Sequence, residues 1–92
     1  MGARRSYVQP TSGPDKDLGA AFRHFRKTRR MTQERLAREA GFGRTYIGLV
    51  ESGVISPRWC NIVRLAAALK VPPVEIVQLA TEPRQEPPGD GQ

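Results

Sequence analysis

Residues 32–53, TQERLAREAGFGRTYIGLVESG, contain two short apolar patterns that decide the fold. Thr32 is a good N-cap and Gly41 a good C-terminal stop, so the apolar residues between them predict a helix of about two turns. A second pattern over residues 44–52 has the same helical spacing and also ends at a glycine. This stretch therefore predicts two short helices that are joined by a glycine-containing turn.

The apolar spacing on either side predicts three further helices and no strand. The helix before the central pair has apolar residues from Leu18 to Phe25 and is expected to end near Arg30. Ser56 and Pro57 form a start signal for a helix after the pair. That helix is expected to bury Trp59, Ile62, Val63, Ala66 and Leu69. The fold class predicted for the chain is therefore all-α, a compact five-helix bundle.

The last of these helices, residues 73–80, is apolar around more of its circumference than one core contact requires. Part of its surface is therefore a candidate for binding a partner. Residues 1–16 and 81–92 contain Gly, Pro and polar residues without an apolar period, which predicts a flexible N-terminal arm and a flexible C-terminal tail. The domain is expected to span residues 17–80, because a chain of 92 residues has no room for a second core.

The charge of the chain favours a polyanionic partner. Fifteen Lys and Arg against nine Asp and Glu give a formal net charge of +6, most of it within residues 17–80. No stretch approaches the roughly 18 consecutive apolar residues that span a bilayer, and no apolar signal core is visible, so we expect a cytoplasmic protein without membrane contact. Cys60 and His24 lack partners in sequence for a disulfide, a metal site or catalysis. We expect no enzymatic activity, metal or cofactor.

Two helices joined by such a turn are typical of the helix-turn-helix unit, whose second helix enters the DNA major groove. At about 100° per residue, Tyr46, Ile47 and Val50 fall on one side of the second helix. Arginine can bond guanine through two hydrogen bonds, leucine can contact the thymine methyl group, and glycine permits close approach. The residues predicted to read bases lie on the opposite side: Arg44, Thr45, Gly48 and Leu49.

About two thirds of the chain resembles the Cro/cI-type (XRE-like) helix-turn-helix regulators. The resemblance is carried by Leu18-Gly19, Phe25-Arg26, Thr32 to Ala37, Ala40 to Phe42, Tyr46-Ile47, Val50 to Gly53, Pro57 and Ile62 to Leu69. It implies a lambda-repressor-like DNA-binding domain in which residues 44–52 form the recognition helix. Two departures stand out, because Met31 and Gly43 occupy positions where relatives often have glycine and a Ser or Thr cap, respectively.

The resemblance also implies roles for individual residues. Gln33, at a helix N-terminus, is expected to hold a DNA phosphate, and Arg58 to reach the minor groove. Arg26 and Glu51 are expected to form an internal ion pair. The full set predicted to contact the DNA backbone or the minor groove is Gln33, Arg35, Tyr46, Ser52 and Arg58.

The function predicted from these features is a sequence-specific, double-stranded DNA-binding transcriptional regulator, an activator or a repressor, that binds a two-fold operator as a homodimer. The predicted dimer contacts are Ile76, Val77 and Leu79. Glu34 and Glu39 could contact RNA polymerase, or could form a salt-bridged surface with the arginines between them. The alternative is an antitoxin that binds a toxin protein and autoregulates its operon.

Overall fold

The computed structural model describes residues 13–82. Within this range the chain forms five α-helices and no strand, as the spacing predicts. The helices are α1 (Gly13–Thr28), α2 (Gln33–Ala40), α3 (Arg44–Ser52), α4 (Trp59–Leu69) and α5 (Pro73–Thr81). In the part of the chain that the structure describes, no helix combines the length and apolar character needed to cross a membrane.

Helix α1 begins earlier than the apolar pattern indicates. Residues 13–16, which the composition places in the flexible arm, form its first turn, where Asp15 lies favourably near the positive end of the helix dipole. Residues 1–12 of the predicted arm and 83–92 of the predicted tail lie outside the described residues.

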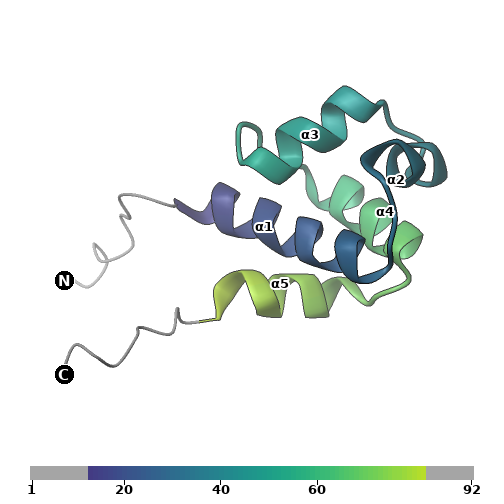
Figure 1. Ribbon diagram of the computed structural model, residues 1–92. Helices are drawn as coiled ribbons and strands as arrows, with labels where there is room; N and C mark the ends of the chain where they lie inside the picture. Colours follow the sequence, from purple (N-terminus) through teal and green to yellow (C-terminus); the bar gives the residue numbers. More distant parts are fainter. Residues whose placement is uncertain (1–12, 83–92) are drawn as a thin grey trace, which may run out of the picture.

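Helix α1 lies between α3 on one side and α5 on the other, and α2 and α4 close the bundle at the end where α1 finishes (Figure 1). The core is contributed by all five helices. Its largest fully buried side chains are Phe22, Leu36, Ile47, Val50, Leu65, Leu69 and Ile76. Burial of this apolar surface stabilises the bundle, in which α2 to α5 are each too short to be stable alone.

The close packing of α1 against α3 depends on a glycine. A Cβ atom added at Gly19 would lie 2.3 Å from the carbonyl oxygen of Val50 and 2.5 Å from that of Glu51. Both distances are far below van der Waals contact, so any larger residue would push the two helices apart. Gly19 therefore sets how closely α1 approaches the C-terminal end of α3.

Two predictions for α4 are wrong. Trp59 is 61% exposed and Val63 is 38% exposed, although the spacing predicts both to be buried. Ile62, Ala66 and Leu69 are buried as predicted, and Leu65 joins them in the core. Trp59 and Val63 are one turn apart, so they share a face that lies outside this contact.

The connection between α1 and α2 contains a left-handed residue other than glycine. Met31, at the position where relatives often have glycine, is buried in the core. The left-handed residue is its neighbour Arg30, with a φ of +58°. Arg29 donates hydrogen bonds to the carbonyl oxygens of Leu69 at 2.8 Å and Lys70 at 3.2 Å, which ties this turn to the end of α4.

Candidate nucleic-acid interface

The predicted helix-turn-helix unit is formed by α2, the turn at residues 41–43 and α3. The Thr32 hydroxyl caps α2 by accepting a hydrogen bond from the backbone N–H of Arg35 at 3.0 Å. Gly41 has a φ of +81° and ends α2, where a side chain would be strained. The backbone N–H of Phe42 then donates to the carbonyl oxygen of Ala37 at 2.8 Å, which closes the turn.

Helix α3 has one buried side and one open side. Ile47 and Val50 are buried in the core. The four residues predicted to read bases occupy the other side, with Arg44 and Thr45 exposed and Gly48 and Leu49 partly exposed. A Cβ atom at Gly48 would meet nothing within 4 Å, so space in front of this part of the helix is open.

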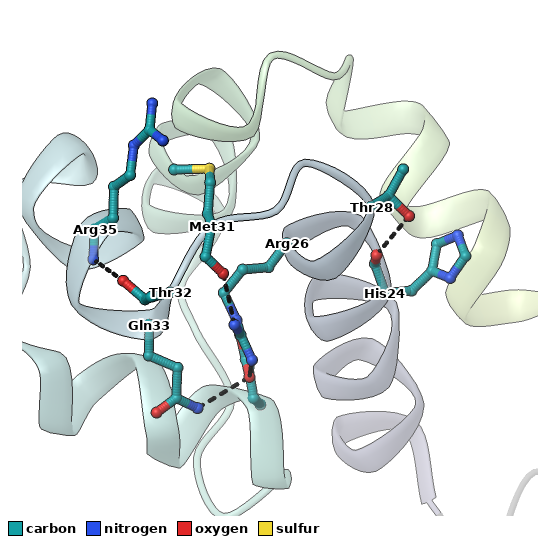
Figure 2. Close-up of polar contacts among 8 residues, drawn as sticks. His24, Arg26, Thr28, Met31, Thr32, Gln33 and Arg35 are labelled. Atoms are coloured by element: carbon teal, nitrogen blue, oxygen red, sulfur yellow. Dashed lines mark hydrogen bonds and ion pairs between the residues drawn. The ribbon is translucent and has the colours of Figure 1, made fainter.

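Arg26 and Glu51 form the ion pair that the resemblance implies, and both are only 9% exposed. Arg26 Nε donates to Glu51 Oε2 at 2.6 Å, and Arg26 Nη2 donates to Glu51 Oε1 at 3.0 Å. The remaining nitrogen, Nη1, donates to the carbonyl oxygen of Met31 at 2.8 Å (Figure 2). The pair therefore joins α1, the turn after it and the C-terminal end of α3.

Gln33 has a contact that the sequence did not predict. Its Nε2 donates to Glu51 Oε1 at 3.1 Å, so its side chain points from the start of α2 to the ion pair (Figure 2). A carboxamide nitrogen carries two hydrogens, which leaves one for another acceptor. The N–H groups of Gln33 and Glu34, which come before the capped N–H of Arg35, have no carbonyl from an earlier turn and can also donate to an anion.

Arg35, Ser52 and Arg58 are exposed, whereas Tyr46, the remaining predicted backbone contact, is half-buried. Arg35 Nε donates to Glu39 Oε2 at 2.9 Å, and this hydrogen bond lowers the pKa of Glu39 below its ordinary value of 4.5. The hydroxyl of Ser52 donates to the carbonyl oxygen of Leu49 at 3.2 Å. Arg58 is exposed at the N-cap of α4. The acidic and basic residues of α2 thus include a salt-bridged pair, which is one of the two interpretations that the sequence allows.

The sequence missed two residues of α4 that contact the unit. Asn61 Nδ2 donates to the hydroxyl of Tyr46 on α3 at 3.0 Å. Arg64 Nη2 donates to the carbonyl oxygens of Ala40 at 2.9 Å and Gly41 at 3.2 Å. The spacing of three between Asn61 and Arg64 puts both on one side of α4, but nothing in the sequence indicates that this side meets the turn.

The predicted dimer residues on α5 are not equivalent. Ile76 is fully buried in the core, so its prediction as a partner contact is wrong. Leu79 is partly buried and packs against the same core. Val77 is 38% exposed, and Val74, which was not predicted, is 63% exposed. The apolar surface of α5 is thus centred on Val74 and Val77.

A capped first helix, a tight turn and a second helix with one open side define the helix-turn-helix class of DNA-binding folds. The sequence matches the family described as "Helix-turn-helix domain" over residues 17–79, and the chain belongs to this family. A comparison with curated protein sequences found no match.

Solved structures similar to this fold include regulators. The restriction-modification controller protein C.AhdI from Aeromonas hydrophila is 36% identical, with a TM-score of 0.65 over 66% of this chain and 92% of the controller. A hypothetical transcription factor, NHTF, from Neisseria is 33% identical, with a TM-score of 0.67 over 75% of this chain and 80% of its own. The clp gene regulator ClgR from Corynebacterium glutamicum shares the fold, with a TM-score of 0.74. It is 24% identical, and the match covers 77% of this chain and 76% of the ClgR chain. The family match and the two neighbours of 36% and 33% identity support a DNA-binding transcriptional regulator.

Proposed function

We propose that this protein is a sequence-specific transcriptional regulator that reads double-stranded DNA with the open side of α3 and acts as a homodimer in the cytoplasm. The observation that carries the proposal is the division of α3 into a side buried by Ile47 and Val50 and a side that presents Arg44 and Thr45 to solvent. A recognition helix needs this division, because one side must be fixed to the domain while the other meets base edges. The proposal includes no catalytic activity.

Arg44 is the residue we assign to the most specific contact. It is the first residue of α3 and is exposed, at the end of a recognition helix whose side chains reach base edges. A guanidinium can donate two parallel hydrogen bonds to the O6 and N7 atoms of guanine. Leu49 can contact a thymine methyl group, and the open space at Gly48 permits close approach of the duplex.

Phosphate contacts fix how α3 sits in the groove. The first N–H groups of α2 and the second Nε2 hydrogen of Gln33 are the donors we assign to one phosphate. Arg58, exposed at the start of α4, supplies a positive charge for the backbone or the minor groove. Together with the net charge of +6, these contacts lead us to expect an affinity that falls steeply as salt is added.

We assign dimerisation to α5, where Val77 is exposed and Leu79 partly so. The more exposed Val74 extends this apolar surface. Two-fold pairing places two recognition helices about 34 Å apart or a multiple of it, which matches one turn of DNA. Sedimentation tests this part, since a protein that stays monomeric at tens of micromolar and on DNA would contradict it.

The readout is tested with the Arg44→Ala protein on a duplex selected by the unaltered protein from a random-sequence library. Loss of a bidentate guanine contact is expected to cost about 1–3 kcal/mol and to remove preference at one base pair per half-site. Arg38→Ala is the matched control, because Arg38 is an exposed arginine on α2 and not on the recognition helix. Its loss should weaken binding to all sequences alike.

The two variants are compared over duplexes that are substituted one base pair at a time. Reduced preference in Arg44→Ala alone supports the proposal. If Arg44→Ala keeps every base preference and only binds all DNA more weakly, Arg44 is a phosphate contact. If the unaltered protein selects no sequence from the library, the proposal of specific DNA binding is wrong.

A further inference from the structure

Helix α3 has little stability of its own. It has nine residues, fewer than an isolated helix needs in water. Its N-cap, Gly43, provides no side-chain hydrogen bond, and Gly48 lies in its interior, where glycine disfavours the helical state. Its C-terminal half is fixed by the core and by the ion pair of Glu51. The first turn, which contains Arg44, therefore depends on other contacts for its order.

The turn before α3 is held from α4 by Arg64. Its Nη2 atom donates to two carbonyl oxygens at the end of α2, those of Ala40 and Gly41. The guanidinium carbon also lies 4.3 Å from the centre of the Phe42 ring, within the range of a cation–π contact. One side chain therefore fixes both the end of α2 and the aromatic residue of the turn.

The contact continues into α3 through two aromatic rings. The centres of the Phe42 and Tyr46 rings are 4.7 Å apart, a distance typical of favourable aromatic pairs. At its far end the Tyr46 ring is held by Asn61, whose Nδ2 donates to the phenolic oxygen at 3.0 Å. Arg64 and Asn61 thus hold the Phe42 and Tyr46 pair from both ends.

We propose that Asn61 and Arg64 are positioning residues that hold the first turn of α3 in the orientation in which Arg44 reads DNA. Gly43 provides no side-chain cap, and the contact of Asn61 supplies a different restraint, because it fixes Tyr46 of α3 to another helix. The consequence for DNA rests on the proposed reading function of α3. The consequence for the order of α3 does not, and it can be measured without DNA.

The first experiment measures amide hydrogen exchange in the DNA-free, full-length protein. Asn61→Ala removes one hydrogen bond to the first turns, and Arg64→Lys keeps the charge but loses the planar group that bridges the turn. Each is expected to speed exchange at the amides of Tyr46 and Ile47 by about 3- to 10-fold relative to the core amides of α1. Arg29→Lys is the matched control, because Arg29 caps α4 in the same manner but away from α3.

A second substitution checks that the effect acts through helix order. Gly48→Ala adds a methyl group where nothing lies within 4 Å and favours the helical state. Added to Asn61→Ala, it is expected to slow exchange in α3 again, by about fivefold. Equal acceleration in α1 and α3, no acceleration at all, or the same pattern in Arg29→Lys would overturn the proposal.

The second experiment measures affinity for the duplex selected by the unaltered protein. Asn61→Ala and Arg64→Lys are expected to weaken binding about 3- to 10-fold without changing its salt dependence, because no charge is removed. Unchanged affinity, or weaker binding without faster exchange in α3, would overturn the positioning role. If no duplex is selected, the reading function fails, while the exchange experiment still decides whether α4 orders α3.

Discussion

Replacement of Glu51 by alanine is expected to destabilise the protein strongly. Its carboxylate accepts two hydrogen bonds from Arg26, at 2.6 and 3.0 Å, and a third from Gln33 at 3.1 Å. Arg26 is only 9% exposed, and without Glu51 it keeps only its bond to the carbonyl oxygen of Met31. A charge left buried and largely unpaired costs about 3–5 kcal/mol, so Glu51→Ala should lower the free energy of unfolding by about that amount.

That loss is large for a small domain, whose total free energy of unfolding is about 5–15 kcal/mol. Each kcal/mol shifts the melting temperature of a domain of this size by about 4–8 °C, so a fall of at least about 12 °C is expected. Urea and thermal unfolding followed by circular dichroism measure both quantities. Glu39→Ala is the control, because it breaks an exposed pair with Arg35 and should change the free energy of unfolding little.

A double variant, Arg26→Met with Glu51→Leu, removes both charges. It therefore distinguishes the loss of the ion pair from the cost of leaving Arg26 buried without a partner. It should recover most of the stability lost in Glu51→Ala, since apolar side chains of similar volume need no partner. A loss below about 1 kcal/mol in Glu51→Ala, close to that of Glu39→Ala, would refute the view that this pair fixes α1 to α3.

Three smaller predictions follow from the same structure. Gly19→Ala should destabilise by about 1–3 kcal/mol in urea unfolding, because its methyl group would lie 2.3 Å from a carbonyl oxygen of α3, whereas Gly48→Ala should be neutral or stabilising. Arg30→Gly should stabilise by up to about 1 kcal/mol by relieving the φ of +58°, and a lower melting temperature would contradict this. NMR titration should give Glu39 a pKa below 4.5, and this pKa should rise in Arg35→Ala. The stabilisation by the Arg35–Glu39 pair is present above the pKa of Glu39 in the unfolded state. It is lost as the pH falls through the lower pKa of Glu39 in the folded state.

Much of the fold was predictable because it depends on local signals. The helix termini at Thr32, Gly41 and Gly53 are set by capping and by left-handed glycines, both of which are visible in sequence. The division of α3 into a buried and an open side follows from its period alone. The ion pair of Arg26 and Glu51 was implied by the resemblance, since its members are far apart in sequence and no local rule links them.

The errors share a different cause. Periodicity shows that a helix has an apolar stripe, but the rotation of the helix against its neighbours decides which edge of a broad stripe is buried. On α4 that rotation exposes Trp59, and on α5 it buries Ile76. In the turn after α1, Arg30 adopts the left-handed conformation and its neighbour Met31 is buried in the core.

By itself, the sequence determined that this protein is an all-α helix-turn-helix domain and which side of α3 is open, because helical period and end signals act within a few residues. Only the tertiary structure decided what holds that side in place. Asn61 and Arg64 reach α3 and its turn from a helix that is distant in sequence, and Gln33 turns to the ion pair. Such contacts depend on how packed helices meet in space, which no local pattern records.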